Sequence, residues 1–238
     1  MGRFLKGFLS VMLLLGLLAM CAAVLVAGVL GVKGYSLYKE SIEQTPLKQR
    51  IEAIQSDEHF IKYQDLPQTY IDAVISVEDH RFYQHHGLDF IAIGRAVLYN
   101  IKEGSFAQGG STITQQVAKN LLFTQEKKLE RKAAEVFAVW DLESHYSKEE
   151  IFELYVNTIY FGSGYYGIYD AAMGYYQKKP QQLTNYECVM LAGLPNAPSA
   201  YSLDQEPELA KQRMKQVLRR MVSNKVLTQE QADALLAQ

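Results

Sequence analysis

A single acidic residue stands out in the stretch 74–89, which reads VISVEDHRFYQHHGLD. Glu78 lies three, four or seven residues from apolar side chains that would share one face of a helix, namely Ile71, Val74, Ile75 and Phe82. Its neighbour Asp79 is expected on the other, polar side with Asp72 and Ser76. A carboxylate on an apolar face is costly unless it is paired or lines a cleft. Two interpretations stay open: a carboxylate tied to a buried arginine, or a general acid or base in a crevice.

A glycine turn that leads into a helix provides a second candidate site, at residues 108–116 (QGGSTITQQ). Ser111 is a suitable N-cap, and the exposed amide groups at the start of a helix attract anions. Helical spacing places Thr112, Gln115 and Lys119 on one side of this helix. The other side is apolar and consists of Ile113, Val117 and Leu121. Such turns are common, and this one lacks the Gly-Lys-Ser/Thr ending of a nucleotide-binding P-loop, so alone it is a weak signal.

Positive charge gathers on the next predicted helix. One face would hold four charged residues with a fifth beside them, namely Lys127, Lys128, Arg131, Glu135 and Lys132. The ordinary interpretation is a surface ion pair between Arg131 and Glu135, worth about 0.2–0.5 kcal/mol. With Lys119 nearby in the sequence, a cluster that binds phosphate becomes a competing explanation. The chain thus offers two candidate carboxylates, Glu78 and Glu135, together with local cations.

An uncharged apolar run precedes these motifs, at residues 7–32. At about 1.5 Å per residue, a helix of this length can cross a hydrocarbon core of roughly 30 Å. A cleaved signal peptide would normally have an apolar run of only about 7–15 residues, so an uncleaved signal anchor is favoured. Arg3 and Lys6 favour a cytoplasmic location for residues 1–6, which would put the bulk of the protein on the outer face.

Charge and cysteine content exclude some classes of function. Arg3, Lys6 and Lys33 are the charged residues before position 34, so 21 basic residues face 26 acidic ones in the remainder. A domain with this balance is not expected to bind nucleic acid, and any anion site must be local. Cys21 lies in the apolar run and Cys188 in the polar part, so they are not expected to pair. Without a Cys/His cluster, a structural zinc site is not expected.

The rest of the chain shows helical signals and no convincing alternation typical of strands. Residues 33–65 are interpreted as a polar connector with weak helical stretches, and residues 66–238 as one globular unit of several short helices. Capping boxes predict three helix starts, at Ser147–Glu150, Thr184–Glu187 and Thr228–Gln231. Pro207 suits the first turn of a last long helix with an apolar stripe. The predicted class is therefore mostly α.

Five segments in order carry a resemblance to a known family. They are EDHRF at 78–82 with HGLD at 86–89, GSTITQQ at 110–116, RKAAE at 131–135, KEEIFELYVN at 148–157 and RMKQVL at 213–218. They are similar to the motifs of the peptidoglycan glycosyltransferases, found in bifunctional penicillin-binding proteins and in monofunctional, membrane-anchored enzymes. The resemblance covers about residues 60–225. Val156 stands where leucine is usual, and Gln212 precedes Arg213 where a second arginine is common; neither departure touches the two glutamates.

The resemblance implies a lysozyme-like helical fold with a small jaw subdomain, partly embedded in the membrane, between the first two motifs. Apolar surface there would come from Leu88, Phe90, Ile91, Val97, Leu98, Ile101 and Phe106, although a place in the core would explain most of these residues equally well. It also implies polymerisation of lipid II, a disaccharide-pentapeptide on undecaprenyl diphosphate. Glu78 would be the catalytic base, and Glu135 the second catalytic carboxylate, supporting the diphosphate. The diphosphate and sugars would be bound by Ser111, Thr112, Gln115, Lys119, Lys127 and Arg131.

Cofactors, partners and location follow from the same resemblance. No cofactor and no protein-bound metal are expected to be required, although a divalent cation (Mg or Mn) could assist at the diphosphate. The partners would be lipid II, the growing glycan strand, lipid of the bacterial cytoplasmic membrane, and other cell-wall synthesis and division proteins. Ser36-Leu37-Tyr38-Lys39 fits the S-x-x-K of a transpeptidase domain, but it adjoins the apolar run and no Lys-Thr-Gly or Ser-Asp-Asn is present. A monofunctional chain is therefore expected.

Two other functions stay open. A lytic or hydrolytic enzyme that acts on finished glycan also uses two carboxylates on such a fold. The cluster of cations argues against it, because a neutral leaving sugar needs no diphosphate site. A non-catalytic membrane scaffold could keep the fold for contact with partners, and a turnover assay would separate it from an enzyme.

Overall fold

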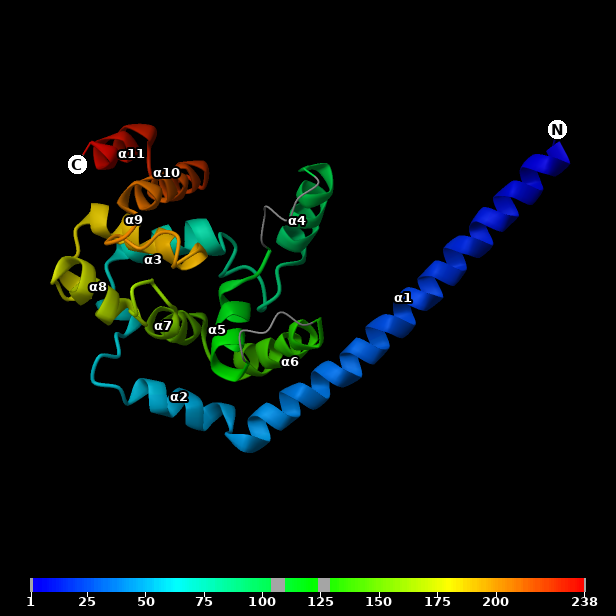
Figure 1. The fold of residues 1–238 in the computed structure, drawn as a ribbon, viewed down its shortest axis with the longest axis horizontal. Helices are drawn as coiled ribbons and strands as arrows, with labels where there is room; N and C mark the ends of the chain where they lie inside the picture. Colours follow the sequence, from blue (N-terminus) through cyan, green and yellow to red (C-terminus); the bar gives the residue numbers. More distant parts are fainter. Residues whose placement is uncertain (1, 104–109, 124–128, 238) are drawn as a thin grey trace.

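The N-terminal helix α1 (Gly2–Gln44) is the longest element, and its first half extends away from the rest of the chain as a rod (Figure 1). The computed structural model describes residues 2–103, 110–123 and 129–237. Large apolar side chains from Phe8 to Val32 are exposed along this rod. The helix is long and apolar enough to cross a membrane, which agrees with the predicted span at 7–32.

The segment 33–65, expected to be a polar connector with weak helical stretches, is largely helical and packs on the domain. It forms the end of α1 and helix α2 (Leu47–Gln55). Tyr38 donates a 2.5 Å hydrogen bond to Asp141, and the Ser41 hydroxyl donates to the carbonyl of Leu122 at 2.8 Å. The segment looks polar in sequence because its buried side chains are few and widely spaced.

Beyond residue 66 the described chain is built of helices, as predicted. They are α3 (Gln68–Glu78), α4 (Phe90–Glu103), α5 (Ile113–Leu122), α6 (Leu129–His145), α7 (Lys148–Thr158), α8 (Ile168–Tyr176), α9 (Asn185–Gly193), α10 (Pro207–Ser223) and α11 (Gln229–Leu236). Single turns of 3₁₀ helix occur at Tyr63–Asp65, Pro180–Gln182 and Leu194–Asn196. In the described part of the chain, strand-like pairing is limited to one isolated bridge between Tyr160 and Tyr166.

Two groups of helices meet at the end of α3. Helix α3 packs against α9 and α10, whereas α5 packs against α6 and α7. The largest fully buried side chains of the shared core are aromatic: Tyr70, Phe82, Phe152, Tyr155 and Phe161. Burying such side chains is worth about 1.5–3 kcal/mol each, so this core holds the two groups in fixed relative positions. As a result, the C-terminal end of α3 faces the start of α5 (Figure 1).

Local capping signals set several helix starts. The three predicted capping boxes are all present, with Ser147, Thr184 and Thr228 each accepting a hydrogen bond from the backbone three residues later. Each Ser or Thr cap contributes about 1 kcal/mol. Pro207 occupies the first turn of α10, and the predicted stripe from Ala210 to Met221 is buried, as expected.

Helix α4 projects from the domain at the position of the predicted jaw (Figure 1). Most of its large apolar side chains are exposed, including Phe90, Ile91, Val97, Leu98 and Ile101. The core explanation for these residues is therefore wrong, because exposed apolar surface of this extent marks a binding face. Phe106, the last of the predicted jaw residues, lies outside the described residues.

Cys188 is fully buried in α9. Burial raises the pKa of its thiol to about 12, and the carboxylate of Glu187 raises that pKa further. Because the thiolate is the reactive form, this cysteine is inert at neutral pH.

Two truncations are expected to separate the rod from the domain. Deleting residues 1–32 should leave the thermal unfolding midpoint unchanged, because Tyr38 and Ser41 keep their contacts. Deleting residues 1–46 removes these contacts, at a cost of about 2–3 kcal/mol, and should lower the midpoint by roughly 4–12 °C. Circular dichroism of both proteins measures the difference. Equal midpoints would mean that the end of α1 is not part of the core.

Candidate active site

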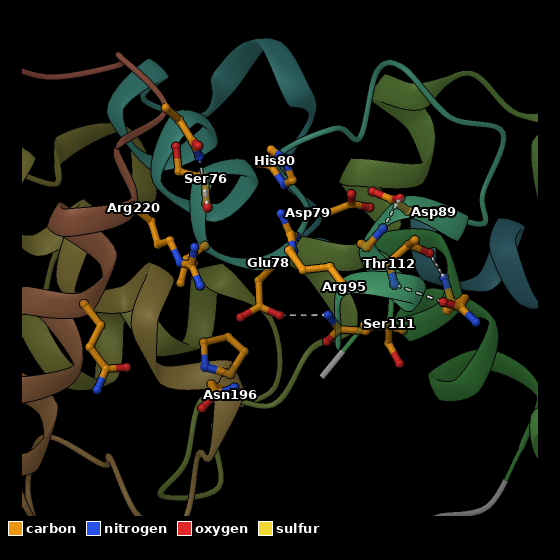
Figure 2. A pocket seen from close by; sticks show the side chains of 18 of the residues that line it. Ser76, Glu78, Asp79, His80, Asp89, Arg95, Ser111, Thr112, Asn196 and Arg220 are labelled. Carbon is orange, nitrogen blue, oxygen red and sulfur yellow. Dashed lines mark hydrogen bonds between the residues drawn. The ribbon is translucent and has the colours of Figure 1, made fainter. Parts of the chain in front are cut away.

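An open cleft of ≈ 1100 Å³ lies between the two groups of helices. It is lined by the end of α3, the start of α5, one face each of α4 and α6, and the C-terminal half of α10. Figure 2 shows Glu78 in the middle of this cleft, with Arg220 to one side and Ser111 and Thr112 to the other. Among the predicted site residues, those that line the cleft are Glu78, Ser111, Thr112, Gln115, Lys119 and Glu135.

Glu78 is the last residue of α3, and its side chain is only 10% exposed. The side-chain amide of Gln116 donates a 2.8 Å hydrogen bond to its carboxylate, and the guanidinium of Arg213 lies 3.6 Å from the other oxygen. The two interpretations left open by the sequence therefore apply together, because the carboxylate both meets a buried arginine and lines a cleft. Burial raises the pKa of Glu78, although the Gln116 hydrogen bond and Arg213 partly oppose this. A raised pKa is what a general base near neutral pH requires.

Asp79 was expected on the polar side of a helix that continues to Phe82, and this prediction is wrong. Helix α3 ends at Glu78, and the changed backbone direction turns Asp79 inward, where it is 6% exposed. Its carboxylate accepts hydrogen bonds from the backbone amide of Ile113 at 3.0 Å and contacts the His85 ring at 2.9 Å. Asp79 thus ties the end of α3 to the start of α5.

The pKa of Glu78 leads to a prediction about stability. A carboxyl group whose pKa is raised on folding stabilises the protein below its unfolded pKa, and this contribution is lost as the pH rises through the folded pKa. Replacing Glu78 by Gln removes this loss. We therefore expect Glu78→Gln to gain thermal stability relative to wild type between pH 4.5 and pH 8. Calorimetry of both proteins at the two pH values tests this, and a constant difference would contradict it.

The start of α5 differs by one residue from the prediction. Thr112, rather than Ser111, is the N-cap, and it forms a capping box with Gln115. Both side chains are therefore nearly buried, at 2% and 4% exposure, instead of lying on an open polar face. The Thr112 hydroxyl also donates to the carbonyl of Gly87 at 2.6 Å. Gly87 has φ +79°, and a Cβ there would lie 2.3 Å from Val139, so only glycine allows this close approach.

Two cations of α6 hold the second glutamate. Glu135 is 1% exposed, and its two carboxylate oxygens accept hydrogen bonds from Arg131 and from Lys132, the latter at 2.6 Å. The pair of Arg131 and Glu135 is thus buried, so the ordinary interpretation as a surface pair is wrong. Lys132 also donates to the Ser111 hydroxyl at 3.2 Å, which connects the cluster to the start of α5. Lys127 lies outside the described residues.

Lys119 lines the cleft from α5, and its ammonium group interacts electrostatically with both glutamates. Burial lowers the pKa of Lys119, while Glu135 and, more weakly, Glu78 raise it. No carboxylate among the described residues forms an ion pair with this ammonium group. The described cations near Ser111 therefore form a group with more positive than negative charge, which suits a multiply charged anion.

Several cleft residues were not predicted as site residues. Gln116 and Arg213 contact Glu78, and the cleft is also lined by Lys132, Arg95, Asn196, Arg219, Arg220 and Asn224. One signal was available for Arg213, since a cation within the apolar stripe of α10 must find a partner when it is buried. The others are polar residues in exposed or partly exposed positions, where sequence spacing carries no such signal.

One cluster among the described residues has metal-ligand geometry. Asp79, His85 and Asp89 each offer a ligand atom, and these atoms lie within 4.8 Å of one another. The donors are already in use, however. Asp89 accepts from Arg81 and from the backbone amide of Ala92, while Asp79 is bonded as described above. The arrangement is that of a hydrogen-bonded network.

Comparison with known proteins identifies the family. The family model described as Transglycosylase matches residues 44–222. The chain is 47% identical over 177 residues to penicillin-binding protein 1A of Neisseria lactamica and 46% identical to that of Neisseria gonorrhoeae; each match covers 74% of this chain and 22% of the relative. Penicillin-binding protein 1A of Aquifex aeolicus is 43% identical over 72% of this chain and 24% of its own. The chain thus spans less than a quarter of the length of these relatives. It belongs to the transglycosylase family, the peptidoglycan glycosyltransferases whose motifs it carries.

Proposed function

We propose that this protein polymerises lipid II into glycan strands by inverting glycosyl transfer. The observation that carries the proposal is the placement of Glu78, a buried carboxylate with a raised pKa, in the same cleft as an excess of cations. Glu78 takes the proton from the 4-hydroxyl of the acceptor sugar. That oxygen attacks C1 of the lipid-linked sugar at the end of the growing chain, and a β-1,4 bond forms. The bond from C1 to the diphosphate breaks, and undecaprenyl diphosphate leaves with the electron pair.

The leaving diphosphate determines what the rest of the cleft must do. Negative charge develops on the departing oxygens, and fixed cations in a partly desolvated site stabilise it. Lys119 and Lys132 line the cleft and suit this role, with Ser111 beside them. Glu135 holds Lys132 and Arg131 in place, so its role is to orient the cations. Because both of its oxygens are engaged, the predicted divalent cation (Mg or Mn) would have to be held mainly by the phosphates, and it stays a prediction.

The apolar surfaces fit a substrate that is borne by a membrane. Helix α1 can span the bilayer, and the exposed apolar face of α4 extends from the same side of the domain (Figure 1). We place residues 1–6 in the cytoplasm and the cleft on the outer face of the bacterial cytoplasmic membrane, where lipid-linked precursor is consumed. Other cell-wall synthesis and division proteins remain predicted partners.

The hydrolytic alternative accounts for the two carboxylates but not for the cations. Hydrolysis of finished glycan releases an uncharged sugar, which gives a buried cation nothing to bind. Burying the ammonium group of Lys119, which has no carboxylate partner among the described residues, would then be a cost without a function. A scaffold without activity would not need a base with a raised pKa. Synthesis is therefore the better explanation of the site.

The decisive experiment is a turnover assay with the full chain in lipid vesicles. The purified protein is incubated with lipid II, and the products are separated by gel electrophoresis. In parallel, the protein is incubated with purified, lipid-free glycan. Polymer from lipid II and intact glycan are expected. Cleaved glycan without polymer would favour the hydrolytic alternative, and no change in either substrate would favour the scaffold.

A further inference from the structure

Helices α1 and α6 run side by side in the same direction, with a fixed register. Near the end of the apolar run, the ammonium group of Lys33 lies 2.9 Å from a carboxylate oxygen of Glu130 at the start of α6. Farther along both helices, Tyr38 is bonded to Asp141. Since contacts at both points join the same two helices, the position of α6 along α1 is set by the structure.

Close packing at one glycine reinforces this register. A Cβ on Gly34 would lie 2.6 Å from the Cβ of Ala133 and 2.8 Å from its backbone, so a side chain here would push the helices apart. One helical turn earlier in α1, a Cβ on Gly31 would meet nothing within 4 Å. Gly34 is thus required for contact with α6, and Gly31 serves as its matched control.

The register places the cations of α6 at a defined distance from the end of the apolar run. Arg131 and Lys132 follow Glu130 directly, and Glu130 pairs with Lys33, the first charged residue after the apolar run. At about 1.5 Å per residue, these cations lie within roughly one helical turn of the end of the span. The headgroup layer of a bilayer is only about 5–7 Å thick on each side. A bilayer spanned by the apolar run would therefore bring these cations level with its lipid phosphates.

An aromatic cluster on the same pair of helices lies somewhat farther from the span, beside Tyr35 and Tyr38 of α1. The ring of Phe137 lies 5.3 Å from that of Tyr35 and 5.9 Å from that of Trp140. Tyr35 is 46% exposed and Trp140 56% exposed, and Leu129 at the start of α6 is 73% exposed. Tyrosine and tryptophan are enriched where a membrane protein crosses the headgroup layer. Exposed aromatic rings that lie directly after a membrane span are better suited to contact with lipid headgroups than to contact with water.

We infer that α1 acts as a rigid spacer that seats the cluster of Tyr35, Phe137 and Trp140 in the headgroup layer of the outer leaflet. This holds the α6 cations at the height of the diphosphate of a membrane-borne substrate. The partner of this surface is the lipid bilayer itself. The role of this depth in binding a diphosphate rests on the proposed function, whereas the depth of α6 in the bilayer does not.

Trp140 is the only tryptophan of the chain, so its fluorescence reports this depth directly. In vesicles of phosphatidylglycerol and phosphatidylethanolamine, a quencher attached to lipid headgroups should quench wild-type protein strongly, and one deep in the acyl chains only weakly. A variant with seven helix-forming residues inserted between Val32 and Lys33 lifts the domain by about 10 Å at nearly the same helical phase. It should lose most of the headgroup quenching. The same insertion between Gly2 and Arg3 is the control and should keep it.

Activity supplies the second measurement. The insertion after Val32 should reduce polymer formation from lipid II in vesicles at least tenfold, whereas a soluble analogue with a short prenyl chain should be used equally well by all variants. Gly34→Leu should lower vesicle activity, and Gly31→Leu should not. Quenching and vesicle activity that are unaffected by the insertion would overturn the spacer. Failure of wild type to use even the soluble analogue would instead count against the proposed function, while the quenching result would still stand.

Discussion

Glu78→Gln is expected to reduce polymerisation of lipid II by at least a factor of about 100, because a positioned general base contributes roughly 10²–10⁴-fold. Glutamine has nearly the same shape and can still accept from Gln116, but it cannot take a proton from the acceptor hydroxyl. The carboxylate is nearly buried, so water cannot easily replace it. The measurement is the initial rate of polymer formation in vesicles, at a substrate concentration that saturates wild type.

A matched control comes from another partly buried glutamate. Burial also raises the pKa of Glu153 on α7, whose carboxylate accepts a 2.7 Å hydrogen bond from the backbone amide of Tyr63, away from the cleft. Glu153→Gln keeps an acceptor for that amide and should polymerise normally. The fold of the Glu78 variant is checked by its unfolding midpoint. A folded Glu78→Gln protein with more than a tenth of wild-type turnover would remove Glu78 from the role of base.

Lys119→Ala and Arg131→Ala are expected to lower the use of lipid II by roughly 10–150-fold each, since a charge-assisted contact is worth about 1.5–3 kcal/mol. Lys119 is the cleaner test, because its ammonium group has no ion-pair partner among the described residues. Arg131 also binds the buried Glu135, so its removal leaves that carboxylate with Lys132 and should lower the unfolding midpoint as well. Rates are therefore compared only at temperatures where each variant is folded.

Lys178→Ala is the control for the loss of a lysine outside the cleft. Lys178, two residues after the end of α8, pairs with Glu187 at 2.7 Å, and its replacement should leave polymerisation unchanged. Neither cation variant should gain the ability to cleave lipid-free glycan, because that bond has no diphosphate leaving group. Unchanged polymer yields from both Lys119→Ala and Arg131→Ala would mean that neither cation contributes to binding of the diphosphate.

Helix starts and apolar stripes were predictable because their signals are local. A capping box needs only four consecutive residues, and the three that were predicted are all present. The one-residue error at α5 had a local remedy: Thr112 and Gln115 have the capping-box spacing, which Ser111 lacks. The apolar run at 7–32 was likewise visible from composition alone.

The missed features depend on partners that are distant in sequence. Asp79 is buried because α3 ends at Glu78 instead of continuing to Phe82, and because Ile113 and His85 satisfy its carboxylate. Helical periodicity cannot show either of these. Arg213 becomes part of the site only when α10 packs beside the end of α3. The contact between Gly34 and α6 depends equally on tertiary structure. Residue type and spacing therefore predicted which groups could do chemistry, while packing decided how they are held.

The buried thiol in α9 has a practical consequence for work on this protein. On the outer face of the membrane, where we propose that this domain lies, disulfides form readily, and an exposed thiolate would exchange with them. The thiol of Cys188 is buried and has a pKa of about 12, so it forms almost no thiolate at neutral pH. Cys21 lies within the apolar half of α1. The native domain therefore behaves as if it were free of reactive cysteine. Single cysteines placed on α4 or α10 should accept spin labels or fluorophores selectively, without first removing a native residue.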